Sequence, residues 1–512
     1  MDTLASIFSH NSSSPSVIIP NGGPILSYPG LHNHVKDLQH TLMENFNLKP
    51  QEVISLVLPN SLEFTVSFLA ITFLRNIAAP LNPNYTENEF KFNFEDSKCK
   101  LIILPMGWVQ QNKPAVKAAV SFNIDILEIN WDDSNKSIKT LFQNKSTHHS
   151  NNEIHHHPYP LDVALLLHTS GTTGRPKGVP LTHKNITTTM KNIGNTYKLT
   201  PNDSTLLVMP LFHVHGLIGG MLSTLLSGGT VVIQPKFSAS TFWNDFLEHK
   251  CTWYTAVPTI HQILLRYPPP NGGAPKLRFI RSCSSSLAPN TLFELEKTFN
   301  APVLEAYAMT EASHQMTSNP LPPLKHKPGS VGVGQGVQIT ILDKNGKQVE
   351  EGEVCVKGAN ITSGYLNNPS ANETSFTKDG WFRTGDQGKF DEEGYLYLTG
   401  RIKELINRGG EKISPLELDS VLLSHPAISE AVSFAVPDDM YGQEVHAAVV
   451  FKQGQNVTEK DLQKFCGNKV AKFKVPKKFY FIDTMPKTAT GKIQRNNISK
   501  TLFKPDKIKS NL

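Results

Sequence analysis

The sequence predicts an α/β protein with a large N-terminal body of mostly parallel, covered sheets and a small α+β C-terminal lobe. Two observations support this fold class. Short apolar runs alternate with helical segments through the body, a pattern typical of parallel strands joined by helices. After Gly400 the chain carries more charge and has shorter elements. We therefore predict two units, residues 1–400 and residues 401–512.

The predicted strands of the body are short β-branched or aliphatic runs. They are Val163–Leu167, Thr205–Val208, Thr230–Ile233, Trp253–Ala256, Leu277–Ile280 and Val303–Ala306. Helices are predicted at His183–Tyr197, where Thr182 can cap the first turn, and at Leu292–Phe299, after an entry that begins at Pro289. This alternation predicts βαβ units and a mostly parallel, covered sheet.

Two segments of the body differ in composition from the rest, one uncharged and one strongly polar. The segment Ser204–Pro235 has no charged side chain, but proline, histidine and glycine interrupt it and leave only Leu217–Leu226 as a helix core. We predict buried strand, turn and helix there, and no stable membrane insertion. The segment Asp132–Pro160 is rich in Asn, Ser, Lys and His. We predict a solvated loop, with its five clustered histidines as polar loop residues and not metal ligands.

The small lobe begins with a clear helix signal. Ser414 can cap the helix, Pro415 suits its first position, Glu417 completes a capping box, and Ile413 can pack against Leu418. Further predicted elements are a second capping box from Thr458 to Asp461 and the strands Ala431–Val436 and Val445–Phe451.

The composition excludes several classes of protein. Hydrophobic residues make up 39% and charged residues 18% of the 512 positions, as in ordinary globular chains and unlike collagen-like, coiled-coil or wholly disordered ones. A net charge of +6 over this length is no nucleic-acid signature, so we predict no DNA partner. The five cysteines are widely spaced without a CxxC pair, which predicts neither a disulfide framework nor a zinc site.

A loop rich in glycine and hydroxyl side chains follows the predicted strand Val163–Leu167. Its residues are Thr169, Ser170, Gly171, Thr172, Thr173, Gly174, Arg175, Pro176, Lys177 and Gly178. Backbone N–H groups, hydroxyl donors and the charge of Lys177 suit a polyphosphate. The loop is not a Walker A motif, because no Gly-Lys-Ser/Thr closes it.

This string resembles the phosphate loop of the adenylate-forming superfamily of acyl-CoA synthetases, adenylation domains and luciferases. Further blocks that resemble the family follow in order: the aromatic gate Met209–His213, the adenine and magnesium block Ala306–Glu311, the ribose block Arg383–Asp386, the hinge Gly400–Lys403 and the catalytic-lysine loop Pro486–Lys492. The resemblance spans nearly the entire chain. It departs at Ala308, where the family more often has glycine and where a methyl group would tighten the adenine site.

The resemblance implies a reaction in two steps: a carboxylate attacks the α-phosphate of ATP, and the thiol of coenzyme A then attacks the acyl-adenylate. The ATP-binding residues that it implies are Thr169, Ser170, Gly171, Thr172, Thr173, Gly174, Lys177, Glu305, Ala306, Tyr307, Thr310, Asp386 and Arg401. The catalytic residues that it implies are His213, Thr310, Glu311 and Lys492.

Each of these groups has a physical role in that reaction. Glu311 would hold Mg²⁺, which prefers few protein carboxylates together with phosphate oxygens. Asp386 would accept hydrogen bonds from the ribose, Arg401 would support that contact, and Tyr307 would stack on adenine. Lys492 would bridge the substrate carboxylate and the α-phosphate, because this step needs charge neutralisation and positioning more than a general base.

The resemblance also implies that the small lobe swings between an adenylating pose, with Lys492 inward, and a thioester-forming pose. Lys403 occupies the hinge position. In the second pose, Gly409 and Gly410 would let the pantetheine chain pass close to the backbone, and Lys412 would meet a phosphate of coenzyme A. The alternative for the glycine pair is a simple turn.

The residues expected around the acid are polar. His213 and His215 follow the gate, Ser284 lies before the adenine block, and His314 follows the magnesium glutamate. A fatty acid or an aromatic acid would bind in a pocket lined by apolar side chains, whereas imidazoles and hydroxyls suit a small acid with a second charge. We predict that His215, Ser284 and His314 bind the distal carboxylate and that Lys492 binds the reacting one. Three segments, Phe212–Gly216, Trp253–Gln262 and Glu305–His314, resemble the oxalate–CoA ligase branch of the family. This resemblance implies formation of oxalyl-CoA in oxalate breakdown.

Other functions stay open at this point. One is a CoA ligase for a 4-coumarate-type or medium-chain acid; others are a luciferase-like oxygenase and a carrier-protein adenylation module. A different class is a non-catalytic RNA-binding scaffold, which would have no need of Lys177, Glu311, Asp386, Arg401 and Lys492 together.

The C-terminal tripeptide bears on localisation. Ser510–Leu512 reads Ser-Asn-Leu and resembles the Ser-Lys-Leu peroxisomal address without its positive charge. Both peroxisome and cytoplasm therefore stay open, the first with a peroxisomal import receptor as partner. The N-terminus has no basic region followed by an apolar stretch, so we predict no signal peptide.

Overall fold

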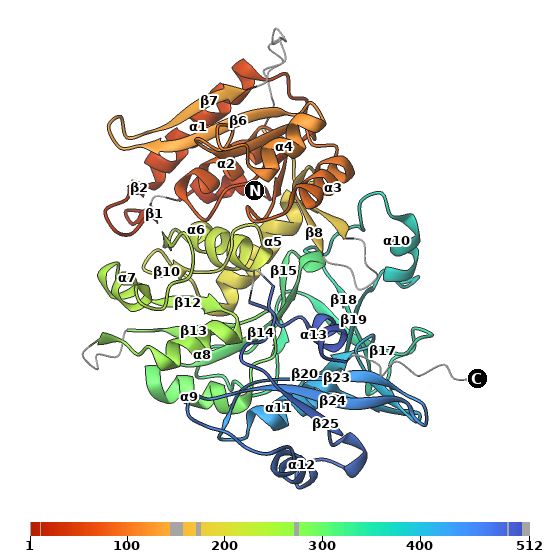
Figure 1. Cartoon of the computed structure of the whole chain (residues 1–512). Coiled ribbons are helices and arrows are strands. Elements are labelled where there is room, and N and C mark those ends of the chain that lie inside the picture. Colours follow the sequence, from red (N-terminus) through yellow and green to blue (C-terminus); the bar gives the residue numbers. More distant parts are fainter. Residues whose placement is uncertain are drawn as a thin grey trace.

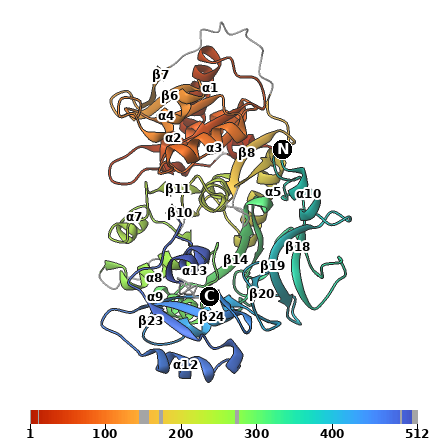
Figure 2. The same ribbon diagram turned by 45° about the vertical axis from the view of Figure 1, so that its right-hand side comes forward.

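The computed structural model describes residues 2–10, 12–143, 157–169, 176–270, 276–488 and 491–503. Within these ranges the strands form four sheets. The N-terminal elements lie at the upper end of the molecule and the blue C-terminal strands and α12 at the lower end (Figures 1 and 2). No helix in the described ranges is long and apolar enough to cross a membrane. All five cysteines are buried and free.

The first sheet has seven strands. In spatial order they are β7 (Ser137–Gln143), β6 (Asp125–Asp132), β5 (Leu101–Pro105), β3 (Val53–Leu56), β4 (Ile77–Pro80), β8 (Val163–Thr169) and β9 (Lys177–Thr182). The strands from β6 to β8 pair in parallel, and β7 and β9 are antiparallel edges. The helices of this part are η1 (Leu4–Phe8), α1 (Tyr28–Asn45), α2 (Leu62–Phe73), α3 (Glu87–Ser97) and α4 (Pro114–Ser121).

The predicted loop from Asp132 to Pro160 is wrong for residues 137–143, which form the edge strand β7. Ile138 and Phe142 lie an even number of residues apart and therefore on one face, and both pack against the largest hydrophobic core. Two apolar residues in a polar segment are too weak a period to read from the sequence. The histidine pairs at 148–149 and 155–156 lie outside the described residues.

The second sheet has nine strands. In spatial order they are β16 (Val333–Gly334), β15 (His314–Ser318), β14 (Val303–Met309), β13 (Phe279–Ser282), β12 (Trp253–Ala256), β10 (Ser204–Leu207), β11 (Thr230–Ile233), β1 (Pro15–Ile18) and β2 (Ile25–Ser27). The strands from β14 to β1 are parallel. The predicted strands of the body are thus confirmed, with ends that differ by up to three residues.

Four of the helices in this part alternate with these strands, and sequence signals predicted the first and the last of the four. They are α5 (His183–Tyr197), α7 (Phe242–Glu248), α8 (Pro258–Arg266) and α9 (Pro289–Phe299). Helix α5 has the predicted bounds because Thr182 and Asn185 form a complete capping box at its start. Helix α9 begins three residues before the predicted Leu292, since Pro289 occupies its first turn.

The uncharged segment after β10 folds as a π-helix, η2 (His215–Leu222), which continues into α6 (Ser223–Leu226). The helix therefore starts two residues before the predicted Leu217. π-Helical turns are rare and frequent at functional sites. A Cβ atom built on Gly219 would lie 2.3 Å from His314 Nε2, so glycine is what allows this helix to approach the start of β15.

A third sheet of four antiparallel strands follows. It contains β17 (Gln338–Leu342), β18 (Glu351–Lys357), β19 (Phe382–Phe390) and β20 (Leu396–Arg401), with α10 (Pro369–Ser375) between β18 and β19. The sequence analysis did not foresee this antiparallel sheet. It matters for the site because its register places Asp386 opposite Arg401.

The fourth sheet lies at the C-terminal end of the chain. Its strands are β22 (Glu411–Ile413), β21 (Ile406–Arg408), β24 (Gly442–Phe451) and β23 (Ile428–Asp438), and β25 (Lys478–Phe481) pairs with β24. Its helices are α11 (Pro415–Leu423), α12 (Glu459–Gly467), η5 (Lys472–Lys474) and α13 (Arg495–Leu502).

Helix α11 begins at Pro415 after the cap Ser414, as predicted, but the predicted capping box is only partly formed. Ser414 accepts a hydrogen bond from the backbone N–H of Glu417, and Ile413 and Leu418 share one buried cluster. The Glu417 carboxylate does not close the capping box, because it pairs with Lys474 at 2.8 Å instead. The second box, Thr458 with Asp461, is complete.

Candidate active site

Four predicted site residues lie together, and we call them the histidine–serine cluster. They are His213, His215, Ser284 and His314. His215 Nδ1 lies 3.0 Å from Ser284 Oγ, and the His215 ring stacks on that of His314 with centroids 5.2 Å apart. The backbone N–H of His215 donates to His213 Nδ1 at 3.2 Å. The segment after β10, the turn after β13 and the start of β15 therefore meet at one point.

The backbone is strained at two residues of this cluster. The φ angle is 73° at Ser284 and 109° at His314. Side chains other than glycine rarely adopt such angles, and each costs on the order of 1–3 kcal/mol. Strain of this kind persists where the surrounding structure fixes it, which happens often at functional sites.

Burial keeps the three imidazoles neutral. It lowers the pKa of His213 to about 4, and the charge of Lys492 adds to the effect. Burial also holds the pKa values of His215 and His314 well below the ordinary value, again with a nearby cation, Arg281. The three rings therefore act as neutral hydrogen-bonding groups.

A residue that the sequence analysis did not select lies behind the cluster. Arg281, on β13, is fully buried, and its Nη1 lies 3.0 Å from His314 Nε2 and 3.1 Å from Thr255 Oγ1. Thr255 Oγ1 is in turn 2.6 Å from His215 Nε2. The sequence feature that could have indicated Arg281 is its place directly after two apolar residues of a predicted buried strand.

Four side chains that are predicted to bind the nucleotide lie on β14, η4 (Thr310–Ala312), β19 and β20, and we call them the carboxylate cluster. Its members are Tyr307, Glu311, Asp386 and Arg401. Arg401 Nε lies 3.2 Å from Asp386 Oδ1, and the Tyr307 hydroxyl donates to Asp386 Oδ2. Burial raises the pKa of Tyr307, and the Asp386 charge adds to the rise. Asp386 is thus held on both oxygens, in a position defined by two strands and β14.

Glu311 is buried within η4. The Tyr365 hydroxyl donates to Glu311 Oε1 at 2.8 Å, and Lys177 Nζ lies 4.5 Å from the centroid of the Tyr365 ring. Burial raises the pKa of Glu311, while the charges of Arg401 and Lys177 oppose the rise. A buried carboxylate of this kind is stabilised by a further cation and fits Mg²⁺, which needs few protein ligands when phosphates supply the others. Sequence reasoning missed Tyr365, for which the sequence offers no signal.

Lys492 lies between the two clusters. Thr259, at the start of α8, donates to the carbonyl oxygen of Gly491 at 3.4 Å, which joins the lysine loop to the body. Burial lowers the pKa of Lys492 to about 8, and the charge of Arg401 adds to the effect. The ammonium group also acts on His213 on the other side. In this structure the lysine therefore faces the body.

Other predicted nucleotide-binding residues are buried on the same strand and turn. Glu305 and Ala306 lie on β14, and Thr310 begins η4. Glu305 accepts a hydrogen bond from the backbone N–H of Leu287 at 2.8 Å, and burial raises its pKa to about 8. Contact of these three residues with ATP stays a prediction.

The predicted phosphate loop is described only at its ends. Thr169 closes β8 and Lys177 opens β9, and the two residues pair in the antiparallel register. The other predicted residues of the loop, Ser170, Gly171, Thr172, Thr173 and Gly174, lie outside the described residues. Polyphosphate binding by this loop stays a prediction.

The predicted coenzyme A residues lie on the β21–β22 hairpin. Gly409 and Gly410 form its turn, with φ angles of 60° and 95°. Two-residue hairpin turns with positive φ match the twist of the strands and favour glycine. Lys412 is exposed on β22, and Lys403 lies in the turn between β20 and β21. A glycine turn of this kind fits both interpretations of the pair, a simple turn and a passage for the pantetheine chain. Contact with coenzyme A stays a prediction.

Comparison with known protein families identifies the class of protein to which this fold and these two clusters belong. The model of the AMP-binding enzyme family matches residues 9–366, and the model of the AMP-binding enzyme C-terminal domain matches residues 417–492. The chain therefore belongs to the AMP-binding enzyme family.

Two relatives and one solved structure cover nearly the whole chain. Oxalate–CoA ligase from Saccharomyces cerevisiae is 50% identical, over 98% of this chain and 97% of that protein. Oxalate–CoA ligase from Arabidopsis thaliana is also 50% identical, over 93% of each chain. The crystal structure of ATP-bound MatB from Rhodopseudomonas palustris matches with a TM-score of 0.87 at 28% identity, over 97% of this chain and 98% of that one. The predicted fold class is confirmed.

Proposed function

We propose that the protein is an AMP-forming oxalate–CoA ligase, which converts oxalate, ATP and coenzyme A into oxalyl-CoA, AMP and pyrophosphate. The observation that carries the proposal is the histidine–serine cluster beside Lys492, because its hydrogen-bonding groups suit a small acid with a second charge. Two relatives that are half identical over nearly their full lengths are oxalate–CoA ligases. Such an enzyme would act at the entry to oxalate breakdown.

The first step joins oxalate to AMP. A carboxylate oxygen of oxalate attacks the α-phosphorus of ATP, and pyrophosphate leaves. Oxalate is already ionised at neutral pH, so the step depends on neutralising two anions and aligning them. Lys492 would neutralise the reacting carboxylate and the α-phosphate, while His215, Ser284 and His314 hold the distal carboxylate.

The carboxylate cluster would hold the nucleotide. Asp386, supported by Arg401, would accept hydrogen bonds from the ribose, and Tyr307 would lie against adenine. The loop 169–177 would bind the phosphates. When bound, Mg²⁺ would neutralise phosphate charge, and Glu311 would be its protein ligand.

The second step transfers the oxalyl group to coenzyme A. The thiol sulfur attacks the carbonyl carbon of the oxalyl-adenylate, and AMP leaves. We propose that residues 401–512 rotate as a lobe about Lys403 against residues 1–400, which takes Lys492 out and brings the Gly409–Gly410 turn in. Lys412 would then bind a phosphate of coenzyme A.

The other functions raised by the sequence have less support. A 4-coumarate-type or medium-chain acid would leave the buried polar groups of the histidine–serine cluster unpaired. A non-catalytic RNA-binding scaffold gives no reason for Lys492 to lie half-buried between two clusters of hydrogen-bonding and charged groups.

Product analysis tests the proposal. The full-length protein, ATP, Mg²⁺, coenzyme A and oxalate should yield oxalyl-CoA, identified by mass spectrometry, with AMP in equal amount. Omission of oxalate should abolish AMP formation. Thioester formation from octanoate or 4-coumarate and none from oxalate would refute the oxalate assignment and leave the ligase class intact.

Localisation depends on Ser510–Leu512, which lies outside the described residues. A fluorescent protein fused in front of the full chain should form puncta that vanish when the tripeptide is deleted, if a peroxisomal import receptor binds it. Diffuse fluorescence from both fusions would assign the protein to the cytoplasm.

A further inference from the structure

We propose that Arg281 determines the specificity of the acid site: it orients the histidine–serine cluster as hydrogen-bond donors and supplies the fixed positive charge that selects an acid with a second carboxylate. This inference rests on the proposed function for the identity of the acid. It goes further by naming the residue that separates dianions from monoanions. Because Arg281 acts through its neighbours, it is a positioning residue.

Arg281 carries a fully buried positive charge with neutral partners. Its hydrogen-bonding partners among the described residues are Tyr197, Thr255, Cys283, His314 and Gln315. None of these side chains is a carboxylate. A buried charge without a counter-ion is costly, and a neutral residue would fill a purely structural position better. A substrate anion would supply the missing opposite charge.

The guanidinium fixes the protonation of His314. Every N–H of arginine is a donor and none can accept, so His314 Nε2, 3.0 Å from Arg281 Nη1, must be an acceptor. Burial and the Arg281 charge hold the pKa of His314 well below the ordinary value, so the ring carries a single proton. That proton is on Nδ1, and His314 therefore presents an Nδ1–H donor.

A second branch of hydrogen bonds also starts at Arg281 and also donates away from it, toward His215 and Ser284. Arg281 Nη1 donates to Thr255 Oγ1 at 3.1 Å. Among the hydrogen-bonding partners of Thr255 Oγ1 in the described residues, only His215 Nε2, 2.6 Å away, can accept the proton of the Thr255 hydroxyl. His215 is neutral as well, so its proton lies on Nδ1 and points to Ser284 Oγ at 3.0 Å. Since Ser284 accepts this bond, its own proton is left for an acceptor in the site.

Both branches end in donors, the Nδ1–H of His314 and the hydroxyl of Ser284. These two donors, together with the buried positive charge of Arg281, favour an acid whose distal group is a carboxylate. An acid that ends in an amide or an alkyl group would leave donors and the charge unpaired, which strongly disfavours it. The strained backbone at both terminal residues, with φ angles of 109° and 73°, is consistent with positions set by this arrangement.

Matched pairs of acids test the proposal on the full-length protein. The probes are oxalate against oxamate, and malonate against malonamate, in which one carboxylate is replaced by a carboxamide of similar shape. The measurement is kcat/KM for acid-dependent ATP–pyrophosphate exchange. Arg281→Gln should lower the oxalate-to-oxamate ratio by about 100-fold, chiefly through the KM for oxalate. Thr255→Val keeps the cation but breaks the second branch, and should lower the ratio by about 10-fold.

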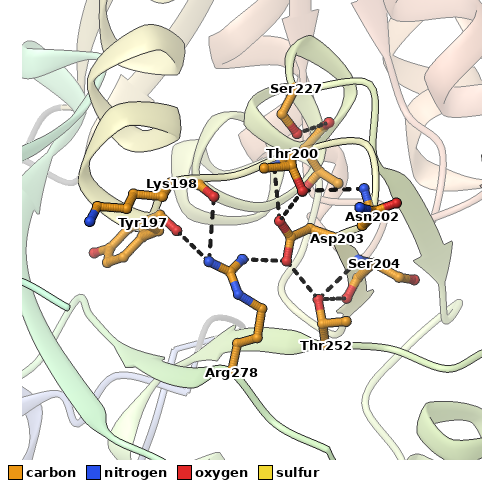
Figure 3. Close-up of polar contacts among 10 residues, drawn as sticks. Tyr197, Lys198, Thr200, Asn202, Asp203, Ser204, Ser227, Thr252 and Arg278 are labelled. Atoms are coloured by element: carbon orange, nitrogen blue, oxygen red, sulfur yellow. Dashed lines mark hydrogen bonds and ion pairs between the residues drawn. The ribbon is translucent and has the colours of Figure 1, made fainter. Parts of the chain in front are cut away.

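The same two strands offer matched control variants. Arg278 precedes β13 and Thr252 precedes β12, and both side chains contact Asp203 at the ends of these strands remote from the cluster (Figure 3). Arg278→Gln and Thr252→Val make the same chemical changes there. They should lower the melting temperature and leave the acid-to-amide ratio unchanged.

The outcomes separate this proposal from the proposed function. A ratio unchanged in folded Arg281→Gln and Thr255→Val would overturn the role of Arg281; if Arg281→Gln does not fold, Thr255→Val decides. A wild-type protein that uses malonate and not oxalate would refute the oxalate assignment, while the malonate-to-malonamate ratio still tests Arg281. Equal use of acids and amides by the wild-type protein would overturn the role of Arg281 directly.

Discussion

At the scale of single residues, Lys492 has the most demanding position. It is a cation in a partly desolvated place, next to another cation, Arg401, and its pKa is lowered to about 8. Such a position costs free energy in the free protein, and the two anions that we propose to bind there, the acid and the α-phosphate, would offset this cost.

Removal of this ammonium group should abolish the first step. We expect Lys492→Ala to lower the rate of oxalate-dependent ATP–pyrophosphate exchange by about 100-fold or more, because charge stabilisation in the transition state is lost. The matched control is Lys487→Ala, in the same loop, whose ammonium pairs with Glu430 at 2.7 Å. Exchange within about twofold of wild type is expected for this control, and an equal loss in both variants would contradict the role of Lys492.

The pKa of Lys492 also predicts a pH dependence. Below a pKa of about 8 the side chain is charged, and above it the neutral amine cannot balance the anions. We expect kcat/KM for oxalate to fall about tenfold per pH unit above that pKa. Lys492→Arg, which stays charged, should remove this fall whatever its absolute rate. If kcat/KM of the wild-type protein stays constant up to pH 9.5, about 1.5 units above the pKa of Lys492, the assignment of this pH dependence to Lys492 is contradicted.

At the scale of elements, the π-helix η2 is the feature on which the acid site depends. It places His215 on the ring of His314, and Gly219 lets the helix approach. We expect Gly219→Ala to displace the His314 ring, because the new Cβ would lie 2.3 Å from Nε2. The KM for oxalate should rise by about tenfold or more, as for loss of a charged or polar contact.

A second glycine gives the control for that substitution. Gly194, in α5, has no atom within 4 Å of a built Cβ. Gly194→Ala should leave the KM unchanged and stabilise the protein by about 0.5–1 kcal/mol, measured by urea unfolding. An equal rise of KM in both variants would show that η2 does not set the acid site.

The sequence predicted elements best where local signals agree with tertiary packing. Helix α5 has the predicted ends because its capping box is local. Strand β7 was missed because only Ile138 and Phe142 of it contact the core. The four-stranded sheet was missed because its antiparallel pairing depends on contacts between distant segments.

The site residues follow the same division. His215, Ser284, His314 and Lys492 could be selected because they lie in recognisable strings. Arg281 and its link through Thr255 could not, since they depend on the register of neighbouring strands.

At the scale of the whole molecule, the proposed reaction needs two arrangements of the C-terminal lobe. In this structure Lys492 faces the body, while the Gly409–Gly410 turn contacts Tyr441 within the lobe through the Gly409 N–H and the Tyr441 carbonyl at 2.8 Å. This arrangement suits adenylation. In the proposed mechanism, the lobe would turn about the segment between β20 and β21 before thioester formation.

A proline at the hinge should separate the two steps. Lys403→Pro fixes one backbone dihedral there. We expect ATP–pyrophosphate exchange within about threefold of wild type and oxalyl-CoA formation lowered by about 100-fold or more. Lys403→Ala is the matched control, because it removes the same side chain without fixing a backbone dihedral, and it should retain both steps. Equal loss of both steps in Lys403→Pro would contradict the hinge.

The most direct test of the central claim is acid selectivity. AMP release by the full-length protein would be measured with ATP, Mg²⁺ and coenzyme A against oxalate, malonate, acetate, octanoate and 4-coumarate, with Lys492→Ala as the inactive control. We predict that kcat/KM for oxalate exceeds that for the monoacids acetate, octanoate and 4-coumarate by about 100-fold or more, because only a short dianion satisfies the buried donors. A preference for octanoate or 4-coumarate would contradict the claim.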